Sequence, residues 1–122
     1  MGNPVVHFEI IGENADLLRR FYRDAFEWTI GNRVEGAGIA DYSLVKPEEG
    51  GGIEGGIGVG PEGYPGHATF YVAVPDIFAA LRRIRNLGGK TIIEPRHVPG
   101  GPMIALFADP EGHIVGLLQG GS

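Results

Sequence analysis

The four histidines are the side chains of this sequence best suited to proton transfer or metal binding near neutral pH. His97 and His113 lie in turn-like segments, where we expect solvated side chains. His7 lies instead in an apolar run, and Glu9 follows it two residues later. Alternate residues of a β-strand point to the same face. His7 and Glu9 are therefore predicted to share one face of a strand.

Glu54 is a second carboxylate with two interpretations, and it lies within the glycine-rich string GGIEGG. One interpretation is a solvent-facing turn residue. The other is an inward-facing strand residue, whose carboxylate would be costly to bury without a partner. His7 is the obvious partner, and a His–Glu pair can transfer protons without a metal. For His7 itself, the alternative is a histidine that is simply hydrogen-bonded beneath a loop.

Several classes of function are excluded by what the sequence lacks. There is no cysteine for a thiol nucleophile or a zinc–thiolate site, no GxSxG motif and no GK[ST] phosphate loop. The net charge is −5 and no basic patch contains interleaved aromatics, so nucleic-acid binding is not expected. No apolar run reaches about 18 residues, so we expect no membrane span. Without a recognisable signal peptide, we expect a cytoplasmic protein.

The first half of the chain has the pattern of a strand, a helix and three strands. Asn14 can cap a helix over residues 15–26, whose apolar side chains follow the spacing of an amphipathic helix. The strands of this half are predicted over residues 5–11, 28–33, 40–45 and 51–58.

The second half repeats this order at an offset of 62 residues, which places Phe8 on Phe70. Asp76 can cap a helix over residues 77–87. The strands of this half are predicted over residues 68–74, 90–94, 103–108 and 114–119. We therefore predict a single α+β domain over residues 1–122, with two βαβββ modules at about 4–60 and 66–120. Because one module's sheet is too small to close alone, the two are expected to pair into a curved mixed sheet with the helices outside.

This order of elements, together with four strings, resembles the vicinal oxygen chelate superfamily of glyoxalases, bleomycin-resistance proteins and extradiol dioxygenases. The strings are VVHFEI, FYRDAFEW, GHATFYVAV and LFADPEGHIVGL, and the resemblance extends over essentially the whole chain. It implies a cup-shaped ligand site in the curved sheet and a homodimer.

Metal-binding members of the superfamily place one ligand on each of the first, fourth, fifth and eighth strands. The matching positions in this sequence are His7, Glu54, Thr69 and Gly116. Thr69 offers only a neutral hydroxyl and Gly116 has no side chain, whereas a catalytic divalent site usually has three protein ligands. We therefore expect no bound metal. The alternative is a divalent metal held by His7, Glu54 and His67, because His67 shares a strand face with Thr69.

The function that these observations favour is metal-independent binding of a small molecule, a hydrophobic or aromatic metabolite such as a toxic natural product. The resemblance to bleomycin-resistance proteins, which act by sequestration, supports it. The alternative is a metal-dependent lyase, isomerase or dioxygenase of the same superfamily, and we assign no catalytic residue. The candidate ligand-binding residues are His7, Glu9, Glu54, His67, Thr69, Tyr71, Met103 and Phe107.

One predicted strand and one tryptophan each have two possible interpretations. Met103, Ala105 and Phe107 alternate along one predicted strand, and they form either an apolar wall of the cup or ordinary core. Trp28 either lines the mouth of the cup or covers the first helix.

Overall fold

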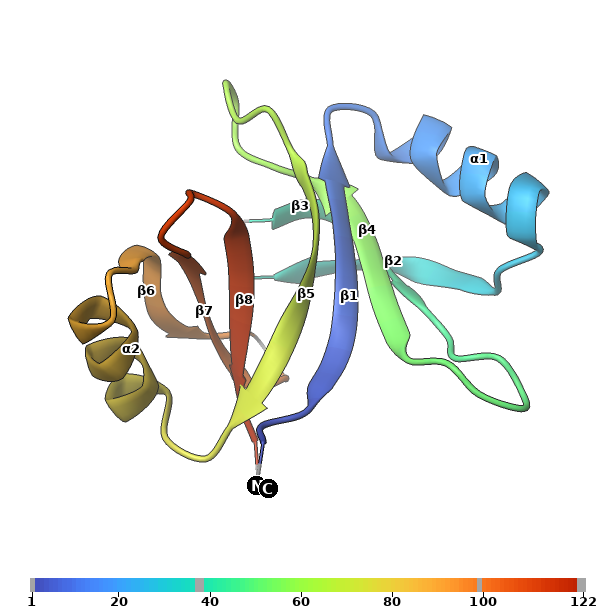
Figure 1. Cartoon of the computed structure of the whole chain (residues 1–122). Coiled ribbons are helices and arrows are strands. Elements are labelled where there is room, and N and C mark those ends of the chain that lie inside the picture. Colours follow the sequence, from blue (N-terminus) through green and yellow to red (C-terminus); the bar gives the residue numbers. More distant parts are fainter. Residues whose placement is uncertain (1, 37–38, 99, 121–122) are drawn as a thin grey trace. The chain divides into compact units, whose positions relative to one another are not determined.

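The computed structural model describes residues 2–36, 39–98 and 100–120 (Figure 1). The chain forms two compact units, one of residues His7–Ala68 and one of residues 1–6 together with 69–122. The strand, helix and three strands predicted for each half are present, which confirms the α+β class and the two βαβββ modules. No helix in these described ranges is both long and apolar enough to cross a membrane.

The first module is a four-stranded mixed sheet with one helix. Its strands are ordered β2-β3-β4-β1, with β1 parallel to β4 and the other neighbours antiparallel. Its elements are β1 (Val5–Gly12), α1 (Ala15–Phe26), β2 (Ile30–Gly36), β3 (Ile39–Val45) and β4 (Glu54–Val59). β4 begins later than predicted because Gly50, Gly51 and Gly52 take positive φ angles, which break the strand.

The second module has the same arrangement, with its strands ordered β5-β8-β7-β6 and β5 parallel to β8. Its elements are β5 (His67–Val74), α2 (Ile77–Asn86), β6 (Lys90–His97), β7 (Met103–Ala108) and β8 (Ile114–Gln119). The turn predicted at His97 is wrong, because β6 continues through this residue in its pairing with β7, although the side chain is exposed as expected.

Helix α1 covers one face of the first module's sheet and begins where the sequence predicts. The Asn14 side chain accepts a hydrogen bond from the backbone N–H of Leu17 at 3.0 Å, which satisfies a free donor of the first turn. The core beneath the helix consists of buried Ala15, Val45 and Ile57. Trp28 belongs to this side, because its ring stacks on Tyr22 at 5.2 Å. The second interpretation of Trp28, as a cover for the first helix, is the one that holds.

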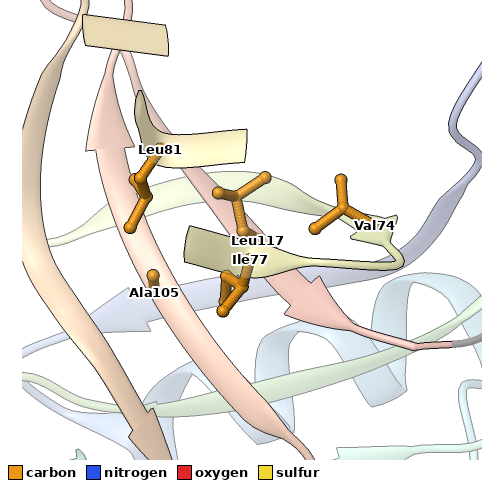
Figure 2. Packing of buried hydrophobic residues seen from close by; sticks show 5 residues of the cluster. All are labelled: Val74, Ile77, Leu81, Ala105 and Leu117. Atoms are coloured by element: carbon orange, nitrogen blue, oxygen red, sulfur yellow. The ribbon is translucent and has the colours of Figure 1, made fainter. Parts of the chain in front are cut away.

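Helix α2 closes the corresponding core of the second module (Figure 2). Its N-cap, Asp76, accepts hydrogen bonds from two backbone N–H groups of the first turn. Figure 2 shows the buried side chains that meet beneath it: Val74, Ile77, Leu81, Ala105 and Leu117. Met103 and Phe107 pack against the same cluster. This face of β7 is therefore the core beneath α2, which favours the core interpretation over a ligand-binding wall.

Two adjacent glycines in β4 make room for aromatic rings on opposite faces of the first module's sheet. A Cβ at Gly55 would collide with the ring of Phe8, which belongs to the core beneath α1. A Cβ at Gly56 would collide with the ring and hydroxyl of Tyr42. Successive strand residues point to opposite faces. Tyr42 therefore crosses β4 on the face that α1 does not cover.

We predict that Gly56→Ala destabilises the domain by roughly 1–3 kcal/mol, because its methyl group would force the Tyr42 ring out of place. The measurement is urea unfolding followed by circular dichroism. Gly31→Ala is the matched control, since a Cβ there meets only the Leu44 carbonyl oxygen at an ordinary 3.6 Å. Equal stability of the Gly56→Ala and Gly31→Ala variants would contradict the crossing of Tyr42 over Gly56.

Candidate functional site

The candidate site lies on the face of β1 opposite to α1. His7 and Glu9 are buried there, with exposed fractions of 8% and 2%. Phe8 and Ile10, between and beyond them, point into the core beneath α1. The sequence-based expectation that His7 and Glu9 share a face agrees with this alternation.

The first set of polar contacts joins Tyr42, His7 and Glu54. His7 Nδ1 lies 3.1 Å from Glu54 Oε1, and His7 Nε2 lies 2.9 Å from the Tyr42 hydroxyl. The strand register explains the first contact, since His7 and Glu54 are direct neighbours across β1 and β4. A carboxylate can only accept, so Nδ1–H of His7 donates to Glu54. When the imidazole is neutral, Nε2 accepts from the Tyr42 hydroxyl.

The three side chains of this first triad differ in how far they are exposed to solvent. The His7 side chain is 10% exposed and that of Glu54 is 55% exposed, while Tyr42 is half-buried. A proton can therefore pass between the phenol and the imidazole without leaving the protein, and the carboxylate end of the triad meets solvent. Of the two interpretations of Glu54, the strand position and the contact with His7 hold, but the side chain is exposed to solvent and is not buried.

Tyr42 owes its position to an irregularity in β3. The register between β3 and β4 shifts between Ala40 and Ser43, and Asp41 takes a φ of 53°, in the left-handed region. A non-glycine residue rarely adopts this conformation without support from its surroundings. The bulge turns the chain so that Tyr42 reaches over Gly56 toward His7.

The support comes from Arg19 of α1, which is 7% exposed. Its guanidinium donates to the Asp41 carbonyl oxygen at 3.1 Å and to Ser43 Oγ at 3.3 Å, so it binds both residues that flank Tyr42. It also pairs with the carboxylates of Asp41 and Asp16. The hydrogen bond from Arg19, with a second one from Arg33, lowers the pKa of Asp16 below its usual 3.8.

The second set of polar contacts joins Tyr64, His67 and Glu9. His67 Nε2 lies 2.7 Å from Glu9 Oε2, and the Tyr64 hydroxyl bonds to His67 Nδ1. By the same donor argument, Nε2–H of His67 donates to Glu9, and when the imidazole is neutral Nδ1 accepts from Tyr64. Burial, together with the negative charge of Glu9, raises the pKa of Tyr64 above 10.0.

A glycine allows this second triad to form. Gly66 has a φ of 97°, and a Cβ there would collide with the carbonyl oxygen of Ile11 in β1. The segment before β5 therefore passes directly against β1. This approach brings His67 onto the face that carries Glu9.

Thr69 and Gly116, the other two positions that match metal ligands of the superfamily, lie in the second module. The Thr69 hydroxyl donates to the carbonyl oxygen of Ile114 at 2.6 Å. Gly116 pairs with Tyr71 across β5 and β8, and a Cβ on it would collide with the Tyr71 ring. In the first module the corresponding neighbours are His7 and Glu54, so the pairing of the two modules differs by two residues.

These donors do not fit a divalent metal. In the ranges 2–36, 39–98 and 100–120, no group of three or more His, Asp or Glu side chains is arranged to hold a metal ion. His67, the alternative third ligand, pairs with Glu9 and Tyr64, whereas His7 pairs with Glu54 and Tyr42. Each imidazole therefore has both ring nitrogens in hydrogen bonds to protein groups.

Two residues of the site, Tyr42 and Tyr64, are absent from the set predicted from the sequence. Tyr64 lies in a segment that reads as a plain turn-rich connection, and its spacing of three residues from His67 is the one local signal. Tyr42 lies in a short strand, far in sequence from His7 and Glu54. Its role depends on a bulge and on a glycine in the neighbouring strand, which strand periodicity does not reveal.

Comparison with known proteins assigns the chain to a family. The model of the Glyoxalase/Bleomycin resistance protein/Dioxygenase superfamily matches residues 5–117, and the chain belongs to this superfamily. No curated protein matches the sequence. The resemblance to the vicinal oxygen chelate proteins is thereby confirmed.

Solved structures show the same fold at low sequence identity. A methylmalonyl-CoA epimerase from Mycobacterium tuberculosis has a TM-score of 0.67 and 17% identity, over 97% of this chain and 88% of that one. A variant of the Streptomyces coelicolor epimerase in complex with 2-nitronate-propionyl-CoA has a TM-score of 0.68 and 17% identity, over 98% and 96%. A hypothetical protein from Bacillus halodurans C-125 has a TM-score of 0.74 and 14% identity, over 100% and 97%.

The raised pKa of Tyr64 predicts a specific loss of stability at alkaline pH. The native state holds this proton more tightly than the unfolded chain, so the stabilisation is fully present below about pH 10 and is lost as the pH rises through the native pKa. In urea unfolding experiments, the wild-type protein should lose more stability between about pH 8 and pH 11 than Tyr64→Phe does. Parallel losses in the two proteins would show that Tyr64 holds its proton no more tightly than in the unfolded chain.

Proposed function

We propose that this protein binds a small organic molecule without a metal, on the face of the first module that carries His7. The observation that carries the proposal is the first triad. The imidazole that would be the first metal ligand has Glu54 on one ring nitrogen and Tyr42 on the other. A metal would have to displace one of these partners from a ring nitrogen of the buried His7, at the cost of that hydrogen bond.

The same contacts suit the recognition of a polar group on an organic ligand. The Glu54 carboxylate is 55% exposed and accepts hydrogen bonds, while the half-buried Tyr42 hydroxyl can donate or accept. A few fixed polar groups of this kind usually orient a ligand in its site. The apolar wall expected from Met103 and Phe107 lies beneath α2. The support for the proposal therefore comes from the polar groups of the site.

The alternative is a metal-dependent lyase, isomerase or dioxygenase. Its support is membership of the superfamily and the similarity in fold to methylmalonyl-CoA epimerases. Against it stand the donors themselves, because Thr69 is hydrogen-bonded to a backbone carbonyl and Gly116 offers no ligand.

Metal analysis separates the two functions. We expect the purified protein to contain well under one equivalent of zinc, nickel, iron or manganese, and a chelator should leave its melting temperature unchanged. Stoichiometric metal that is lost in both His7→Ala and His67→Ala would overturn metal-independent binding in favour of the enzyme.

Native mass spectrometry tests the binding role. We expect a co-purified small molecule in the wild-type protein and less of it in His7→Ala and Tyr42→Phe, because both changes remove polar contacts from the site. His113→Ala is the matched control, since this histidine is exposed and pairs with Asp109 in the second module. Undiminished ligand in Tyr42→Phe and His7→Ala would place the binding site elsewhere.

The homodimer implied by the superfamily remains a prediction. Light scattering of the protein after size-exclusion chromatography should give twice the mass of the 13.0 kDa chain. A monomer at micromolar concentration would contradict it.

A further inference from the structure

Tyr42, His7 and Glu54 have the order of groups that activates a hydroxyl nucleophile. Such sites hold a hydroxyl within hydrogen-bond distance of a base, and a third group orients the base. Here the Tyr42 hydroxyl lies 2.9 Å from His7 Nε2, and Glu54 lies 3.1 Å from the other ring nitrogen. Since Glu54 accepts from Nδ1–H, the lone pair of Nε2 faces the phenol proton.

We propose that Tyr42 is a nucleophilic phenol that takes an acyl group from an activated acyl donor. In this step the Tyr42 oxygen attacks the carbonyl carbon of the donor, so an O–C bond forms and the bond to the leaving group breaks. The phenol proton passes to His7 Nε2, and the resulting imidazolium is stabilised by the Glu54 carboxylate. His7 then gives this proton to the leaving group, and the protein is left with an acylated Tyr42.

The exposure of the carboxylate distinguishes this triad from the second one. The Glu54 side chain is 55% exposed and that of Glu9 is 2% exposed, whereas the His7 and His67 side chains are similarly buried and both phenols are half-buried. Burial and the negative charge of Glu9 also raise the pKa of Tyr64, so its phenol gives up its proton less readily. The second triad therefore serves as an internal comparison.

Arg19 strengthens the assignment because it holds the two residues that flank Tyr42. Its guanidinium binds the backbone carbonyl of Asp41 and the hydroxyl of Ser43, the two residues that flank Tyr42. A nucleophile held at a fixed distance from its base loses little conformational freedom in the reaction. Arg19 is thus a positioning residue for Tyr42.

The test is acetylation of the full chain by N-acetylimidazole, followed by peptide mapping that gives a rate for each tyrosine. We expect Tyr42 to react faster than Tyr64 and faster than Tyr22, whose ring stacks on Trp28. Hydroxylamine should reverse the modification, as for any tyrosine ester. His7→Gln should slow acetylation of Tyr42 by about tenfold or more, because the base is lost.

Glu54→Gln is the second variant, and it guards against a failure of His7→Gln to fold, since the Glu54 side chain is 55% exposed. It should also slow acetylation of Tyr42, whereas His113→Gln should leave the rate unchanged. The proposal is overturned if Tyr42 reacts no faster than Tyr22, or if the rate at Tyr42 is the same in Glu54→Gln as in the wild-type protein. Ligand binding plays no part in this experiment. The proposed binding function can therefore fail while the acylation of Tyr42 is confirmed, and the acylation can fail while binding is confirmed.

Discussion

The candidate site depends on the space left by the missing side chain at Gly56. A tyrosine that starts in β3 can contact a histidine in β1 only if its ring crosses β4, and any Cβ at Gly56 would block that path. The second module uses the same kind of space differently. There Gly116 accommodates the ring of Tyr71, at a position where metal-binding relatives are expected to carry a ligand. Glycine thus permits a polar triad in one module, and in the other it leaves a ligand position without a donor.

The bulge in β3 shows how a local strain is kept in place. Asp41 takes a φ of 53°, and one buried guanidinium binds the residues on either side of Tyr42. Burying Arg19 costs solvation, which the carboxylates of Asp16 and Asp41 offset. Helix α1 therefore does more than cover the sheet, because its inner face carries the residue that shapes the site on the opposite face.

The sequence predicts the fold well and the site in part. Caps at Asn14 and Asp76 and the alternation of apolar residues are local signals, and they yielded both helices and the two modules. The face shared by His7 and Glu9 follows from strand periodicity as well. The contact partners of His7 and Glu9 do not follow from this periodicity. Tyr42 reaches His7 because of the bulge in β3 and the space over Gly56, and His67 reaches Glu9 because of the tight turn at Gly66. Such contacts depend on how three strands pass one another, which a single sequence does not record.

The most direct test of this account is the tautomer of His7, measured by long-range ¹H–¹⁵N correlation spectroscopy in weakly alkaline solution. The two hydrogen bonds predict a neutral imidazole with its proton on Nδ1, facing Glu54, and ring-nitrogen shifts that do not change when one equivalent of Zn²⁺ is added. The Tyr42→Phe variant should alter the Nε2 shift and leave the proton on Nδ1. A proton on Nε2, or a Zn²⁺-dependent shift of either nitrogen, would contradict the claim that the protein, and not a metal, holds this histidine.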